Sequence, residues 1–266
     1  MKNNTFYLLC CVLTALILTG SGRAQETYGK AAIRDGLREI EVGKALSQLP
    51  EMGTKPEDFV PPHWTIMQRV EGDMNADGIK DWAFILVLDE KDTAYIKSLE
   101  KLDKDPSWID SAFIIAVVDS RGDRKMHLGE INYQLLGDSG ATVRNGDGRD
   151  EFKLEMKKNV LDVITSSGGS LRNDAVFHFR QDPPTGGFLT LIGFDTENYC
   201  VTITNDCGKS RVSDNYLTNT RVTTDYTVRG DNIVGTDKKS TIGPIKVSFA
   251  NARLNGSNEK GGTLPY

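Results

Sequence analysis

Acidic and amide side chains alternate through the segment Gly72–Asp81, which also has a glycine at the sixth position counted from Asp73. Hard cations such as Ca²⁺ bind about six to eight oxygen ligands, and alternate residues of a tight loop point inward to supply them. Gly78 permits the turn, because glycine adopts the left-handed backbone at low cost. The spacing therefore predicts a calcium loop. Its ligands would be four side chains and one backbone carbonyl, from Asp73, Asn75, Asp77, Asp81 and, through the carbonyl, Ile79.

The loop differs from an EF-hand, which needs a bidentate Glu at loop position 12 and a helix on either side. Position 12 is Phe84, inside the apolar, strand-like run Trp82–Leu88. The stretch Gly72–Leu88 instead resembles the D-x-[DN]-x-D-G-x-x-D hairpin loops of FG-GAP and VCBS repeats, as in integrin-α-type β-propellers. The resemblance implies Ca²⁺ bound between two antiparallel strands, Trp64–Val70 and Trp82–Leu88. The alternative interpretation is a solvated acidic turn that holds no metal.

A later segment, Val143–Glu151, repeats part of this pattern and also runs into a strand that begins with an aromatic residue. It lacks the first ligand, because Val143 stands where the first loop has Asp73. Successive Asn-Gly and Asp-Gly pairs are common turn sequences, so a plain turn is the favoured interpretation over a second ion site. The side chains that such a second site would use are Asn145, Asp147 and Glu151.

The N-terminus has the features of a secretory signal peptide: a charged start at Lys2, an apolar run over Phe6–Thr19 and small residues up to Ala24. We expect cleavage after Ala24 and a periplasmic or extracellular product without stable membrane insertion. The order of the chain also loosely resembles a group of secreted bacterial proteins that carry this loop early and a Ser-Gly-Gly-Ser turn, here Ser167–Ser170, between later strands. That resemblance implies no known activity.

Two cysteines follow the predicted signal peptide, Cys200 and Cys207. In an oxidising compartment they should form a disulfide that closes a short loop. A metal site would need further Cys or His residues nearby, and the sequence has none there. The disulfide is therefore the favoured interpretation.

The chain after residue 62 predicts a mainly β fold of antiparallel meanders, arranged as two four-stranded blade-like or sandwich-like units. Helical spacing of apolar residues predicts an N-terminal helix over Tyr28–Leu49, and a short helix is expected at Thr93–Leu102. The expected divisions are a signal peptide (1–24), helix and linker (25–62), β domain (63–254) and flexible tail (255–266). The expected strands are Trp64–Val70, Trp82–Leu88, Ala112–Asp119, Met126–Leu136, Glu151–Lys157, Val160–Ser166, Ala175–Arg180, Phe188–Asp195, Cys200–Thr204, Arg221–Val228 and Ile245–Ala250.

The sequence gives only weak matches to the motifs of known enzyme families. Gly137–Ala141 is similar to the nucleophile segment of trypsin-like proteases, but His63 and His127 stand in different surroundings from the histidine base of that family, and a turn explains the segment better. The three histidines of the chain have no zinc-site spacing. A pair of catalytic carboxylates stays open among 37 acidic residues.

The net charge of −5 and the absence of a long basic cluster argue against a nucleic-acid partner. We therefore predict an exported, non-catalytic calcium-binding β protein, in which Ca²⁺ stabilises a β-hairpin loop and the loops face a protein or glycan partner. The alternative is a secreted hydrolase with structural Ca²⁺ and a carboxylate-pair active site.

Overall fold

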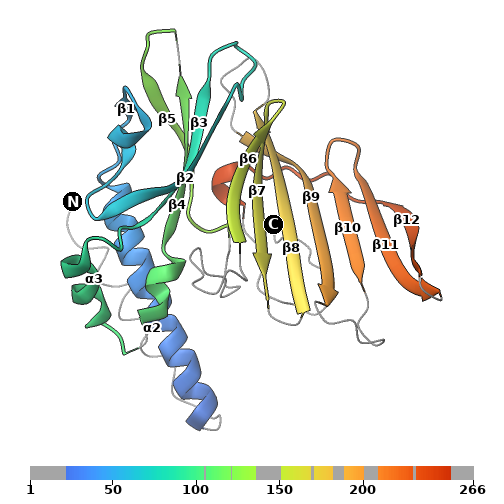
Figure 1. The fold of residues 1–266 in the computed structure, drawn as a ribbon, viewed down its shortest axis with the longest axis horizontal. Coiled ribbons are helices and arrows are strands. Elements are labelled where there is room, and N and C mark those ends of the chain that lie inside the picture. The colour runs from blue at the N-terminus through green and yellow to red at the C-terminus, as the bar shows by residue number, and fades with distance from the viewer. Residues whose placement is uncertain are drawn as a thin grey trace, which may run out of the picture.

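The protein folds into two antiparallel β-sheets with helices on one side (Figure 1). The structure, a computed structural model, describes residues 22–104, 106–120, 122–135, 151–168, 171–181, 189–200, 209–229 and 232–252. Its helices are α2 (Gly22–Leu46) and α3 (Thr93–Glu100), with short 3₁₀ helices η1 (Pro56–Phe59), η2 (Pro106–Ser111) and η3 (Phe249–Asn251). Among the described residues, no helix is both long and apolar enough to cross a bilayer.

The first sheet, sheet A, has five strands in the order β1-β5-β4-β3-β2. Their bounds are β1 (Met52–Gly53), β2 (Trp64–Gly72), β3 (Asp81–Leu88), β4 (Phe113–Ser120) and β5 (Met126–Asn132). The hairpin that joins β2 and β3 carries the predicted calcium loop, since Gly72 pairs with Asp81 at its base.

The second sheet, sheet B, has seven strands in the order β12-β11-β10-β9-β8-β7-β6, so each strand pairs with its neighbour in the sequence. Their bounds are β6 (Glu151–Lys157), β7 (Val160–Ser167), β8 (Leu171–Gln181), β9 (Leu189–Cys200), β10 (Ser210–Asn215), β11 (Thr220–Arg229) and β12 (Asn232–Thr241). In Figure 1, β6 lies next to sheet A and β12 lies at the far end.

Alternating residues of both sheets form the main core between them. On sheet B, Phe177 and Phe179 of β8 are fully buried, whereas the intervening His178 points to the opposite face. On sheet A, Ile85 and Ile115 face the same core. The period-two alternation of a strand explains this division, because successive side chains leave a sheet on opposite faces.

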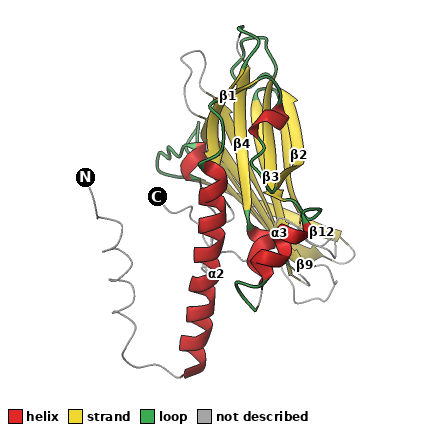
Figure 2. Ribbon diagram, turned by 90° about the vertical axis from the view of Figure 1, so that its left-hand side faces the viewer, coloured by secondary structure: helices red, strands yellow, loops and turns green. Residues whose placement is uncertain are grey.

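The other face of sheet A packs on the helices, which Figure 2 shows alongside the sheet. Phe84 and Ile114 contact a second core cluster that includes Val42 of α2, Leu99 of α3 and Trp108 of η2. Sheet A is therefore buried on both faces. This explains why β3 and β4 are nearly continuous apolar runs, as strands covered on both sides generally are.

The mainly β fold with antiparallel sheets and an N-terminal helix is confirmed. The sheets have five and seven strands instead of the expected four each. The expected strand Ile245–Ala250 is wrong: only Ser248 forms an isolated bridge, to Thr190, and η3 follows it. The expected strand Cys200–Thr204 is shown only at Cys200, which ends β9, and residues 201–204 lie outside the described residues.

Three further expectations concern residues that lie partly or wholly outside the described part of the chain. The predicted signal peptide lies outside them up to residue 21, and α2 begins at Gly22. Cys207 lies outside them, so its disulfide with Cys200 stays a prediction. The proposed second ion site lies outside them from residue 143 to 150, and nothing is described of the Glu151 side chain.

Candidate functional site

The loop between β2 and β3 holds its backbone through its own acidic side chains. Asp73 accepts hydrogen bonds from the backbone N–H groups of Asp77 (3.1 Å) and Gly78 (2.9 Å). Asp77 in turn accepts one from the N–H of Ile79 at 2.7 Å. Gly78 has a φ of +83°, the left-handed region that favours glycine. The alternating oxygens thus turn toward the inside of the loop, as the sequence predicts.

A second strand brings a further carboxylate to this loop. The side-chain nitrogen of Asn75 lies 3.1 Å from Asp77 Oδ2 and 3.2 Å from Asp119 Oδ1. Asp119 belongs to β4, and the pairing of Trp82 with Val118 places it beside the loop. Two anionic oxygens therefore share one neutral donor. A sequence pattern confined to the loop could not reveal Asp119, because only the pairing of β3 with β4 brings it there.

Asp81 has a different position from the other predicted ligands. It is 1% exposed, and its two oxygens accept hydrogen bonds from the backbone N–H groups of Met74 and Ser120, both at 2.9 Å. Burial raises the pKa of Asp81 to about 6, against the lowering by these two hydrogen bonds, and the charges of Asp119 and Asp77 raise it further. Asp81 therefore anchors the hairpin to β4, and its ionised form is disfavoured first by burial and then by the neighbouring acids.

The structure thus brings Asp73, Asn75 and Asp77 together, adds Asp119, and uses both oxygens of Asp81 for backbone contacts. The basic residue of the segment, Lys80, forms its ion pair with Glu71 instead. Within the described part of the chain, no group of three or more His, Cys, Asp or Glu side chains is close enough to hold a metal ion as arranged. The loop is an acidic, oxygen-rich turn whose side-chain oxygens bond amide groups of the loop and would have to rearrange to coordinate an ion.

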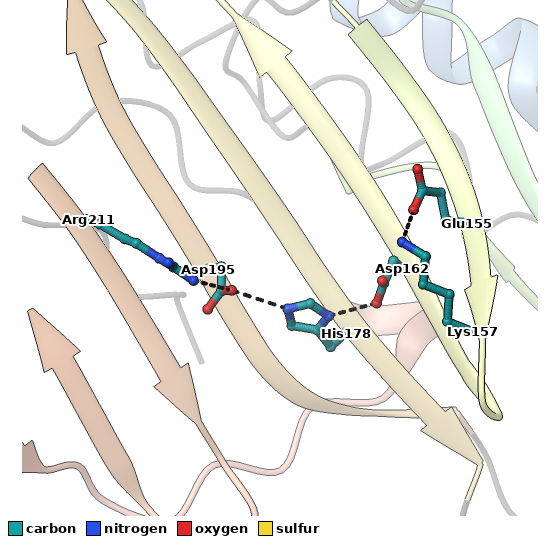
Figure 3. Close-up of polar contacts among 6 residues, drawn as sticks. All are labelled: Glu155, Lys157, Asp162, His178, Asp195 and Arg211. Atoms are coloured by element: carbon teal, nitrogen blue, oxygen red, sulfur yellow. Dashed lines mark hydrogen bonds and ion pairs between the residues drawn. The ribbon is translucent and has the colours of Figure 1, made fainter. Parts of the chain in front are cut away.

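A second polar arrangement crosses the outer face of sheet B, and the sequence analysis did not predict it (Figure 3). His178 Nδ1 lies 2.7 Å from Asp162 Oδ1 and its Nε2 lies 3.7 Å from Asp195 Oδ2. Arg211 continues the row, 3.3 Å from the same oxygen of Asp195. The four residues come from β7, β8, β9 and β10. Asp162 lies directly opposite His178, whereas the contacts of Asp195 with His178 and with Arg211 run diagonally between neighbouring strands. We call them the His178 row.

Electrostatics hold the His178 row in its charged form. Hydrogen bonds to Asp162 and Asp195 raise the pKa of His178 to about 9, although burial acts in the opposite direction. Burial would raise the pKa of Asp195, but His178, Ser213 and Arg211 lower it to about 2. Positive and negative groups alternate along the row and offset one another. His178 is therefore held as a cation between two carboxylates, which is unsuited to a general base at neutral pH.

A cavity of about 550 Å³ beside β5 contains two further carboxylate residues, Glu51 and Glu130. Glu130 is 9% exposed, and its Oε1 accepts a hydrogen bond from the backbone N–H of Leu189. Burial raises the pKa of Glu130, and the amides of Leu189 and Ala250 act against it. Its Oε2 is buried and makes no hydrogen bond of normal geometry to the described residues. Glu130 therefore faces the interior and ties β5 to β9, a structural position.

Comparison with known proteins gives no family for this chain: no protein-family model, curated protein or solved structure matches it.

Proposed function

We propose that this protein is an exported, non-catalytic calcium-binding β protein, in which Ca²⁺ at the β2–β3 loop stabilises the hairpin and the neighbouring end of β4. The observation that carries the proposal is the gathering of loop and β4 oxygens around the Asn75 amide, at 3.1 Å from Asp77 and 3.2 Å from Asp119. Carboxylate and amide oxygens are the ligands that Ca²⁺ prefers.

The residues fit a hard cation by their chemistry. Asp73, Asn75, Asp77 and Asp119 would supply side-chain oxygens, and Ile79 would supply a backbone carbonyl. A bound cation would also offset the charges of Asp77 and Asp119, which raise the pKa of the buried Asp81. The chain's own contribution is to hold the loop backbone through Asp73 and to fasten it to β4 through Asp81.

The experiment compares thermal unfolding of the purified protein in excess EGTA and in millimolar CaCl₂. A ligand at about 100 times its Kd adds about 2.7 kcal/mol to the free energy of unfolding, which raises the Tm by several degrees. Asp77→Ala should abolish this shift. Glu39→Ala, which removes an exposed acid from α2, should keep it. A wild-type Tm that does not respond to calcium would refute the proposal.

A binding role is proposed over catalysis. Two acid–base groups with shifted pKa values outside the loop both have internal partners: His178 is held by two carboxylates and Glu130 by a backbone amide. The secreted hydrolase would need a pair of acids that face a substrate. Glu51 and Glu130 line one cavity, but Glu130 is engaged by the backbone N–H of Leu189. The partner that we propose for the exposed loops is a protein or a glycan.

A further inference from the structure

The last strand of sheet B, β12, pairs with β11 on one side, and on its other side no strand of the described residues lies next to it. It pairs with β11 through ten consecutive residue pairs without a bulge, from Asn232 with Arg229 to Thr241 with Thr220. Residues 234–241 are all exposed. Figure 1 shows β12 at the end of the molecule away from sheet A. A long regular strand thus has one edge whose backbone groups are not paired with any strand of the described part of the chain.

The other three sheet edges are short or occupied. At one edge of sheet A, β1 has only two residues. At the other, β2 has a bulge between Ile66 and Gln68, and the Gln68 side chain bonds the backbone of Leu154 in β6 twice, at 3.0 and 2.8 Å. Strands β2 and β6 therefore cover each other. Proteins usually protect open edges by shortness, bulges, proline or charged side chains. Strand β12 has no proline and no bulge in its pairing with β11, and its charged residues are Asp237, Lys238 and Lys239.

Charges along β12 fit a second copy of the same strand. Asp237 and Lys239 lie on one face of the sheet because they are two residues apart, and Lys238 lies on the other. Two copies related by a two-fold axis perpendicular to the sheet pair antiparallel, with residues of the same face opposed. With the axis at Lys238, each Asp237 lies opposite the Lys239 of the other copy. The pairing extends over Gly235–Thr241.

The like charges at the axis are already compensated within each copy. Lys238 Nζ lies 3.2 Å from Asp225 Oδ2 of the neighbouring strand β11. Opposite charges directly across a strand pair stabilise it, whereas uncompensated like charges destabilise it. Moving the axis by one residue to Asp237 would instead oppose Asp237 with itself. Asp237 already bonds Thr224 at 2.7 Å, which fixes its position on the outer face.

We propose that two copies of this chain associate through antiparallel pairing of their β12 strands, with Asp237 of each copy opposite Lys239 of the other. The two seven-stranded sheets then form one continuous sheet. About seven residues of strand bury less area than a standard interface, so the dimer is weak and depends on protein concentration. This inference is independent of calcium binding.

The test is sedimentation equilibrium of the full chain, purified as the expressing cell processes it, from about 10 μM to about 1 mM, a range suited to weak association. The wild type should form a dimer within this range. Asp237→Lys and Lys239→Asp should each lower the association constant at least tenfold, because each converts two attractive pairs into repulsive ones. Lys101→Asp, at the end of α3, reverses an exposed charge elsewhere and should change nothing.

The decisive sample is an equimolar mixture of Asp237→Lys and Lys239→Asp. Both cross-strand pairs are then opposite in charge again, so a heterodimer should form with close to the wild-type association constant. The double variant D237K/K239D should likewise recover self-association. A misfolded variant could not be rescued by mixing, so recovery separates pairing from folding. A wild type that stays monomeric at 1 mM, single variants that dimerise as the wild type does, or a mixture that stays monomeric would each overturn the proposal.

Discussion

The β2–β3 loop and the His178 row are both acidic sites on β-sheets, but their charges are balanced differently. In the loop, Asp73, Asp77 and the added Asp119 have backbone amides and one neutral side-chain amide as partners. In the row, Asp162 and Asp195 flank a cationic histidine, and Arg211 completes the alternation. The row supplies its own counter-charges, whereas Asp73 and Asp77 in the loop accept hydrogen bonds from backbone amides, and Asp77 and Asp119 accept them from the Asn75 amide.

We expect a bound cation to matter more for acidic residues whose partners are neutral amides than for acidic residues that are paired with cations of the chain. A row of alternating charges built from four strands contributes to stability and needs no ligand. The loop lies between two strands and receives a further acid, Asp119, from a third strand. The stability of the loop should therefore depend on the calcium concentration of the solution. Changes of pH in the alkaline range should act mainly on the row, because the pKa of His178 is about 9 whereas that of Asp81 at the loop is about 6. Changes of calcium concentration should act mainly on the loop.

The largest expected effect is the loss of the His178 row's stabilisation at alkaline pH. Because folding raises the pKa of His178 from 6.5 to about 9, its contribution is complete below pH 6.5 and is lost as pH rises through 9. At most about 3 kcal/mol of unfolding free energy is involved. Denaturant unfolding at a series of pH values measures it, and His178→Gln should flatten the curve between pH 6.5 and 9. An equally steep curve in that variant would assign the loss to other groups.

A smaller effect is expected from Asp119→Asn, which keeps an oxygen ligand but removes one charge from the loop. Calcium affinity should fall about tenfold, or about 1.4 kcal/mol. Calorimetric titration with CaCl₂ measures it directly. Asp123→Asn, an acid in the turn after β4 that bonds Lys125 and His127, serves as the matched control. Unchanged affinity in Asp119→Asn would show that β4 takes no part in the site.

The smallest effect is expected from Arg211→Ala. The Arg211 side chain is 48% exposed, and ion pairs at exposed positions contribute about 0.2–1 kcal/mol. Its removal should lower the free energy of unfolding by less than 1 kcal/mol and leave the calcium response intact. Urea unfolding with and without calcium checks both expectations. A loss as large as that of His178→Gln would mean that Arg211, and not His178, holds the carboxylates of the row.

The sequence predicted strands well where burial on both faces makes a strand a continuous apolar run. Strands β3 and β4 are buried on both faces, and their apolar runs were located within one or two residues. Strand β12, in contrast, was not among the expected strands, because its residues Asn232–Thr241 show no apolar alternation. Its pairing with β11 makes it a strand, and that pairing depends on the backbone of a neighbour rather than on its own side chains.

The candidate site likewise has one part that the sequence predicted and another that only the tertiary structure revealed. The sequence by itself determined the loop: the spacing of Asp73, Asn75 and Asp77 and the glycine at 78 act within nine residues (73–81), where local geometry follows from residue type. Only the tertiary structure decided that Asp119 joins the loop, that Asp81 is buried beneath it, and that Asp162, His178 and Asp195 align. Those contacts depend on which strands pair and in which register, and the pairing is settled by burial of the shared core between the two sheets.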